Sequence, residues 1–105
     1  MLHQEEGGFV YASTTMFNMP PGARPKMEEL ADKMLVGMRQ MPGFVSITFV
    51  MDGENNEYGG LALWETKENA EAAMTQTGAK LDETLAGKTI GPLRRSLYEV
   101  YEPQV

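Results

Sequence analysis

Residues 42–66 read PGFVSITFVMDGENNEYGGLALWET and carry most of the information on architecture. After a Pro-Gly turn, the run Phe44–Met51 is rich in β-branched and aromatic residues, which favour a strand. The polar segment Asp52–Asn56 then reverses the chain, and a second apolar run stops at the single tryptophan, Trp64. Thr66, just beyond it, is a preferred helix N-cap. The stretch therefore predicts a β-hairpin that passes straight into a helix.

The segments on either side of this hairpin predict two more strands and a second helix. Residues 25–41 carry apolar side chains every three or four positions, the pattern of an amphipathic helix. Pro25 suits the first turn of this helix, and Pro42-Gly43 ends it. The helix after the hairpin is expected to break or kink near Thr77-Gly78, because glycine weakens a helix interior. Residues 90–92, Ile-Gly-Pro, are expected to form a short loop. The expected strands are 9–17, 44–51, 58–63 and 93–102, and the expected helices are 25–41 and 66–85.

This order of elements predicts an α+β ferredoxin-like fold of the βαββαβ type. Such a chain builds a four-stranded antiparallel sheet with both helices on one face. A length of 105 residues suits one domain with a single core. We expect residues 9–102 to form this domain and the polar, acidic residues 1–8 to be a mobile lead-in.

The composition excludes several classes of partner. A formal net charge of -6 argues against nucleic acid, because phosphate binding needs clustered basic residues and Arg94-Arg95 is the one adjacent pair. The absence of cysteine excludes disulfides, thiolate metal sites and a cysteine nucleophile, and His3 has no metal-binding partners. No apolar segment approaches the ~20 residues of a membrane span. The N-terminus has no signal-peptide pattern, so we expect a cytoplasmic protein. Since neither cysteine nor a histidine cluster is present, we also expect no metal.

Alternation along the expected strands divides the sheet into two faces. The set expected against the helices is Val45, Ile47, Phe49, Met51, Leu61 and Leu63. The other face is expected to carry small residues ringed by aromatic ones: Tyr11, Ser13, Thr15, Phe17, Phe44, Ser46, Thr48, Val50, Tyr58, Gly60, Ala62 and Trp64. In the last strand the alternation is ambiguous and leaves the direction of Glu99 open.

Aromatic residues on an open sheet face would form a contiguous apolar patch, which monomers rarely expose. A second copy related by a two-fold axis is the simplest cover, so we expect a homodimer through this face. The small residues would then leave a cavity between sheet and partner, suited to a small aromatic or apolar ligand. The alternative is that the aromatic side chains cover a half-solvated sheet that has no pocket.

Three short motifs point to a known family. Residues 41–45 (MPGFV), 61–70 (LALWETKENA) and 96–100 (SLYEV) resemble a Pro-Gly-Phe entry to the second strand, a strand-to-helix corner and a closing strand. All three are similar to motifs of the antibiotic biosynthesis monooxygenases, members of the dimeric α+β-barrel superfamily. The likeness spans Phe9 to Glu102. It implies a dimeric barrel and cofactor-independent oxidation of a small quinol or phenol.

In that chemistry the substrate loses a proton and its electron-rich anion reduces oxygen, so the resemblance implies no cofactor. Trp64 stands at the family's strand-end tryptophan and is the candidate catalytic or pocket-wall residue, although plain burial of a large ring is the competing interpretation. Gly60 stands where some quinol-oxidising members carry an asparagine. Haem-degrading members have an asparagine at Thr15 and a histidine on the second helix, and both are absent here. Haem degradation is therefore disfavoured.

Polar residues expected on the same face complete the candidate site. Tyr11 and Tyr58 are candidates to hydrogen-bond a substrate oxygen or to deprotonate a phenol. A tyrosine of pKa ~10 is a poor base unless a positive charge lies near, and the sequence does not place Arg94 or Arg95 relative to the pocket. An inward, desolvated Glu99 would be an alternative base. The predicted substrate-binding residues are Tyr11, Ser13, Thr15, Tyr58, Gly60 and Trp64.

Two other functions remain open at this point. A non-catalytic dimeric module that binds a small apolar molecule fits the same fold, and it is favoured by Gly60, by Thr15 and by the absence of a histidine from the second helix. Haem binding or breakdown is the third possibility.

Overall fold

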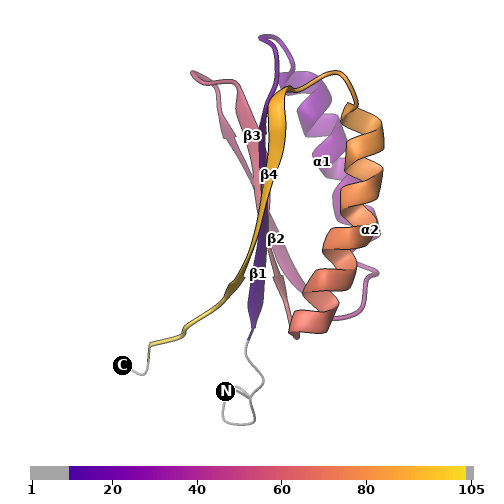
Figure 1. Ribbon diagram of the computed structural model, residues 1–105, viewed down its shortest axis with the longest axis vertical. Helices are drawn as coiled ribbons and strands as arrows, with labels where there is room; N and C mark the ends of the chain where they lie inside the picture. The colour runs from indigo at the N-terminus through magenta and orange to yellow at the C-terminus, as the bar shows by residue number, and fades with distance from the viewer. Residues whose placement is uncertain (1–9, 104–105) are drawn as a thin grey trace.

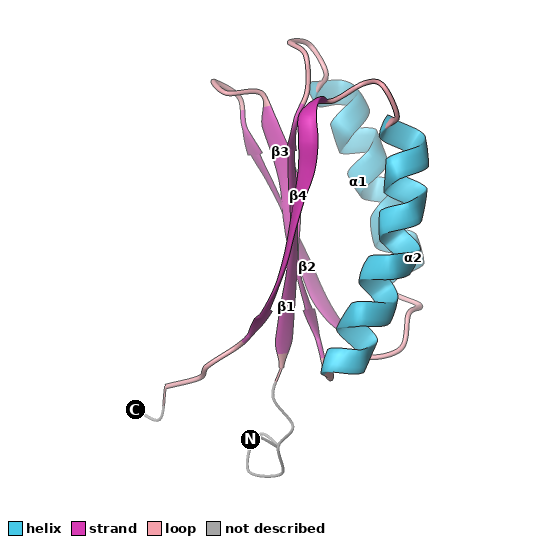
Figure 2. Ribbon diagram, in the orientation of Figure 1, coloured by secondary structure: helices cyan, strands magenta, loops and turns pink. Residues whose placement is uncertain are grey.

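The computed structural model describes residues 10–103, which form one four-stranded antiparallel sheet covered on one face by two helices (Figure 1). The elements are β1 (Tyr11–Asn18), α1 (Arg24–Met38), β2 (Phe44–Asp52), β3 (Glu57–Trp64), α2 (Lys67–Leu85) and β4 (Ile90–Glu99). The sheet order is β2-β3-β1-β4, and Figure 2 shows both helices on the same side of it. The ferredoxin-like fold is thereby confirmed. The predicted lead-in, residues 1–8, lies outside the described residues.

The ends of the helices follow the predicted chemistry. Pro25 stands in the first turn of α1, where a missing N–H is harmless. Thr66 caps α2, because its hydroxyl oxygen accepts a hydrogen bond from the Asn69 backbone N–H at 3.0 Å. The hairpin turn between β2 and β3 is held by Asp52, whose carboxylate accepts from the backbone N–H groups of Glu54 and Asn55.

A predicted break and a predicted loop are absent from the structure. The helix does not break at Thr77-Gly78, since α2 is one continuous helix from Lys67 to Leu85. Gly78 is buried beside the Arg95 guanidinium, and tertiary packing of this kind outweighs a propensity cost of about 1 kcal/mol. The loop expected at 90–92 is wrong, because β4 begins at Ile90. Pro92 is tolerated there because β4 is an edge strand.

Cross-strand register fixes the two faces of the sheet. Tyr11 pairs with Trp64, Ser13 with Ala62, Thr15 with Gly60, and Phe17 with Tyr58. In β2, Ile47 pairs with Ala62 and Phe49 with Gly60. Paired residues point to the same side of an antiparallel sheet. Ile47 and Phe49 therefore share a face with the whole predicted small-and-aromatic set of β1 and β3.

That shared face is the one covered by the helices. Ile47, Phe49 and Met51 lie on it as predicted. The prediction is wrong for Leu61, Leu63 and the exposed Val45, and it is wrong for the small and aromatic residues of β1 and β3, which lie under the helices.

Trp64 and Ala62 pack with Ala70 and Ala73 of α2 in one buried cluster. Leu61 and Leu63 alternate with them and point to the open face, where Leu61 is 42% exposed. The cavity therefore lies between sheet and helices of one chain and not between the sheet and a partner.

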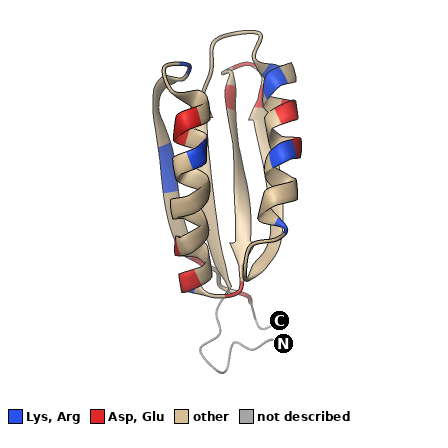
Figure 3. Cartoon of the chain, turned by 90° about the vertical axis from the view of Figure 1, so that its right-hand side faces the viewer, with Lys and Arg blue, Asp and Glu red and all other residues tan. Residues whose placement is uncertain are grey.

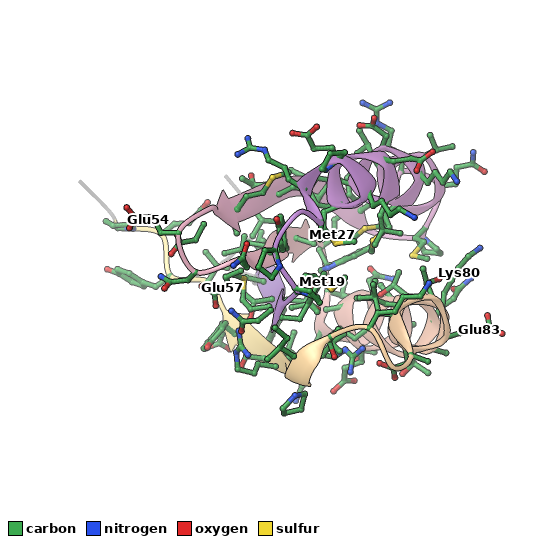
Figure 4. All side chains as sticks on the ribbon, turned by 90° about the horizontal axis from the view of Figure 1, so that it is seen from above. Met19, Met27, Glu54, Glu57, Lys80 and Glu83 are labelled. Atoms are coloured by element: carbon green, nitrogen blue, oxygen red, sulfur yellow. The ribbon has the colours of Figure 1, made fainter. Side chains whose placement is uncertain are left out.

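The outer surfaces of the helices carry the charge, while sulfur and carbon fill the interior. Lys, Arg, Asp and Glu residues are spread along both helices, with neither sign gathered in one patch (Figure 3). Seen from above, Met19 and Met27 lie between the helices and the sheet, whereas Lys80 and Glu83 point outward from α2 (Figure 4). Met19 and Met27 belong to a buried cluster with Phe17 and Tyr58.

Gly43 is the backbone position that joins the turn before β2 to the start of α2. Its φ is +77°, its carbonyl accepts the Glu65 N–H at 2.8 Å, and a Cβ there would collide with the Asn69 side chain. We expect Gly43→Ala to lower the free energy of unfolding by about 2 kcal/mol or more, from backbone strain plus this clash. Gly22→Ala is the matched control, since Gly22 has φ +89° but open space around its Cα. Equal losses for the two variants in urea unfolding would refute the contact with Asn69.

Candidate functional site

A cavity of about 70 Å³ lies between the sheet and the two helices. Its floor is formed by four small residues in two adjacent rows of the sheet, Thr15 beside Gly60 and Ser13 beside Ala62. Larger rings close the floor at both ends. Trp64 stands at one end, and the Phe17–Tyr58 pair, with ring centroids 6.4 Å apart, stands at the other. The small residues thus leave the space that the aromatic ones enclose.

The roof of the cavity is rich in methionine. Four methionines of the helices belong to this roof, namely Met27, Met34 and Met38 of α1 and Met74 of α2, and Met51 of β2 lines the cavity from the sheet. The methionines of α1 stand at the spacing of core residues, and they also form one wall of the cavity. Methionine has three rotatable bonds and makes favourable sulfur–aromatic contacts. Since 70 Å³ is about half of the ~150 Å³ cavity that admits benzene, an aromatic guest requires these side chains to rearrange.

Trp64 is 1% exposed, and its ring is held in one orientation. Its indole Nε1–H donates a 3.0 Å hydrogen bond to the hydroxyl of Ser13 on the neighbouring strand. The ring of Phe44 packs against it edge-on, with centroids 5.7 Å apart and an interplanar angle of 76°. Because Ser13 already accepts the indole N–H, Trp64 presents a rigid apolar wall to the cavity.

Removal of the Ser13 hydroxyl should leave a buried indole N–H without an acceptor. We expect Ser13→Ala to lower the free energy of unfolding by about 1–3 kcal/mol, the usual cost of an unsatisfied buried donor. Ser46→Ala, on an exposed serine of β2, is the control and should change stability by less than about 0.5 kcal/mol. Chemical denaturation measures both. A Ser13→Ala protein as stable as the parent would mean that the indole finds another acceptor.

Tyr11 is the one predicted substrate-binding residue that does not line the cavity. It is paired with Trp64 in the last row of the sheet, where its hydroxyl donates to Glu99 Oε2 at 3.3 Å. Partial desolvation and the nearby Glu99 carboxylate raise the pKa of Tyr11 above its ordinary value. Both effects favour the neutral phenol, which argues against the predicted role of Tyr11 as a base. Glu99 points to the helix-covered side but remains exposed.

Of the other predicted residues, Ser13, Thr15, Tyr58, Gly60 and Trp64 all line the cavity. The Thr15 and Tyr58 hydroxyls make no hydrogen bond to another residue within 10–103. A Cβ on Gly60 would come within 3.3 Å of the Thr48 carbonyl oxygen, so the floor has little room for a side chain at this position. These positions are geometric facts, and the substrate-binding role remains a prediction.

Arg95 is a cavity residue whose position sequence reasoning left open. It pairs with Thr15 across β1 and β4 and lines the space, whereas Arg94 points to the opposite face and forms an ion pair with Glu57 at 2.9 Å. Among the described residues that line the cavity, Arg95 is the one with a charged side chain. Alternation of side chains along β4 puts Arg94 and Arg95 on opposite faces of the sheet. It does not say which of them faces the helices, because that depends on the pairing register between β1 and β4.

Two further findings concern the described part of the chain. Within residues 10–103, no group of three or more His, Cys, Asp or Glu side chains is arranged to hold a metal ion. Neither helix in that range is long and apolar enough to cross a membrane. His3 lies outside the described residues.

No family model and no curated protein matches the chain. Solved structures do match. A monooxygenase from the gene ActVA-Orf6 of Streptomyces coelicolor, in complex with Nanaomycin D, has a TM-score of 0.73 over 92% of each chain, at 20% identity. SnoaB, a cofactor-independent oxygenase from Streptomyces nogalater, has a TM-score of 0.70 over 91% of this chain and 97% of that chain, at 17% identity.

A third match is a protein of unknown function, NE2512 from Nitrosomonas europaea. Its TM-score is 0.77 at 14% identity, and the match covers 92% of this chain and 94% of that chain. Identities this low carry information on the fold and not on the reaction. A structure described as a putative antibiotic biosynthesis monooxygenase from Nitrosomonas europaea also matches, with a TM-score of 0.76 at 13% identity over 91% of this chain and 94% of that chain. The chain therefore has the fold of the antibiotic biosynthesis monooxygenases.

Proposed function

We propose that this protein is a cofactor-independent monooxygenase that acts on a small aromatic quinol or phenol. The observation that carries the proposal is the cavity itself, a floor of small residues closed at one end by a fully buried Trp64. Two proteins with the same fold and similar length are described as a monooxygenase and a cofactor-independent oxygenase. The cytoplasmic location expected from the sequence accompanies this proposal.

In this proposal the chain supplies shape, dryness and polar contacts. A flat ring enters between the methionine roof and the floor, and Trp64 sets the depth of the site. The deprotonated substrate gives its electrons to O₂, one oxygen atom enters the product and the other leaves as water. Exclusion of bulk water by the apolar wall strengthens each electrostatic contact with the anion.

Oxygen uptake tests this function. Purified protein is supplied with quinols, anthrones and hydroxynaphthoates, and consumption is followed with an oxygen electrode beside Trp64→Phe. We expect protein-dependent uptake with at least one compound and at least a ten-fold lower rate in the variant, which keeps a ring but changes the shape of the wall. Uptake that is equal in both proteins would contradict the role of Trp64.

A non-catalytic ligand-binding module is the second candidate. One observation favours it, namely that no carboxylate or histidine is among the described residues that line the cavity. Without either group, the monooxygenase reaction has only water to take the proton of the substrate, whereas binding alone needs no base. A flat oxygen trace together with ligand binding would select this function.

We also propose that the partner is a second copy of the chain, docked on the open face of the sheet. That face carries Leu61, Val50 and Tyr98, which are 42%, 42% and 55% exposed. Leu61 lies on β3 at the centre of the sheet, with Thr14 and Thr48 beside it. An apolar face of this kind is usually covered in a soluble protein. The cavity belongs to each chain separately, so the dimer would pair two complete sites.

A further inference from the structure

Arg95 reaches from the edge strand across the side of the cavity to α2. It stands beside Thr15 in the register, and its side chain is 28% exposed. A Cβ built on Gly78 would lie 3.5 Å from Arg95 Nε, so the guanidinium packs against the bare Cα of this glycine. The cation is therefore held at the wall of an otherwise uncharged, largely apolar space.

The hydrogen bonds of Arg95 use only part of its donor capacity. Nη2 donates to Asp82 Oδ1 at 2.8 Å and to the Gly78 carbonyl at 3.4 Å. A guanidinium has five N–H donors. Within residues 10–103, Nε and Nη1 donate to no acceptor, and the Thr15 hydroxyl is also unpaired. Arginine and threonine thus offer unused donors from adjacent strands at the same level of the floor.

We propose that Arg95, assisted by Thr15, binds an anionic oxygen of the ligand, which is an aromatic molecule that carries a carboxylate or a phenolate. The inference rests on the proposed use of the cavity as a ligand site. A planar guanidinium matches two oxygens or one charged oxygen, and the low dielectric of the apolar wall strengthens the contact. In the proposed reaction, the same contact favours the phenolate, which is the electron-rich form of the substrate.

Asp82 competes with the ligand for this cation. Its carboxylate is 59% exposed, at the outer side of α2, so it holds Arg95 from the solvent side. Removal of the Asp82 charge should leave Arg95 in place against Gly78 and increase its positive field in the cavity. A purely structural ion pair would give no such gain.

Calorimetric titration without oxygen present tests the proposal. The probes are 2-naphthoate and its neutral analogue 2-naphthalenemethanol, and the proteins are the parent, Arg95→Met and Arg94→Met. We expect Arg95→Met to weaken naphthoate binding by about 10- to 100-fold, the value of a charge-assisted hydrogen bond, and to leave the neutral analogue within about three-fold. Arg94→Met removes the adjacent cation on the opposite face and should match the parent.

Asp82→Asn supplies a gain-of-function arm that does not depend on Arg95→Met folding. It should tighten naphthoate binding by roughly two- to five-fold and leave the neutral analogue unchanged. Titration with 4-nitrophenol above its own pKa separates the two sources of charge. If Arg95→Met weakens 4-nitrophenolate binding as it weakens naphthoate binding, the site also accepts phenolates. If 4-nitrophenolate binding is unchanged in Arg95→Met, the site accepts only carboxylates.

Three results would overturn the proposal. The parent protein binds no naphthoate, or Arg95→Met weakens the binding of both probes equally, or Arg95→Met changes the binding of neither probe. These outcomes are independent of turnover. Binding that depends on Arg95 without oxygen uptake would refute the monooxygenase function and keep the anion site. Uptake that is indifferent to Arg95→Met, with binding also unchanged, would refute the anion site alone.

Discussion

Replacement of Trp64 by alanine is expected to lower the free energy of unfolding by about 3–5 kcal/mol, the range for truncation of a buried tryptophan. The ring is 1% exposed, contacts Phe44 edge-on and satisfies its N–H through Ser13, so little nearby can collapse into the space. The whole free energy of unfolding of a domain of this size is only about 5–15 kcal/mol. The variant should therefore lose a large part of its stability and all of the proposed turnover.

Tyr101→Ala is the control for this loss, because Tyr101 is 78% exposed. It should change the unfolding free energy by less than about 0.5 kcal/mol. Equilibrium denaturation in urea measures both variants. A Trp64→Ala protein within 1 kcal/mol of the parent, by the usual error of such a measurement, would contradict tight packing around the indole.

Introduction of a carboxylate at Leu61 should separate the proposed dimer. A two-fold interface would bring in two buried, unpaired charges at once, so we expect Leu61→Glu to raise the dimer dissociation constant by about 100-fold or more. The fold of the chain itself should survive, because the side chain is 42% exposed in the isolated subunit.

Val36→Glu is the matched control for the dimer. Val36 is 60% exposed on α1, away from the open sheet face, and its replacement should leave the mass unchanged. Sedimentation velocity over a range of concentrations gives the association state. A parent protein that sediments as a single chain at micromolar concentration would remove the dimer from the proposal.

Much of the fold was predictable because its signals are local. The Thr66 cap, the Pro25 start and the Asp52 turn depend on one or two residues each, and all are present in the structure. The composition of the cavity floor was predictable for the same reason. Period-two alternation alone assigns Gly60 and Ala62 to one set.

The position of that floor was not predictable, because both faces of β3 are apolar. Leu61 and Leu63 on one side and Ala62 and Trp64 on the other give no contrast that identifies the helix-covered face. A register irregularity between Phe44 and Ser46 also changes which β2 residues join each set. The pairing of β3 with β1 decides which face of β3 lies under the helices. This pairing joins segments far apart in the sequence, so local patterns do not predict it.

The same limit explains Arg95 and Gly78. Alternation in β4 allowed either face for Arg95 until Thr15 was found opposite it. The glycine that predicted a helix break is instead the position that gives the guanidinium room against α2. A residue that weakens a helix locally can thus be favoured by a contact from a distant strand.

The claim that the ligand site lies under the helices is tested most directly by NMR of protein labelled with ¹³C in the methionine methyl groups. The five cavity methionines are Met27, Met34, Met38, Met51 and Met74, and Met16 on β1 points to the open face. On titration with 2-naphthoate, we expect the methyl signals of those five to shift while that of Met16 stays in place. A shift confined to Met16 would place the ligand on the open sheet face and contradict the account, as would the absence of any shift.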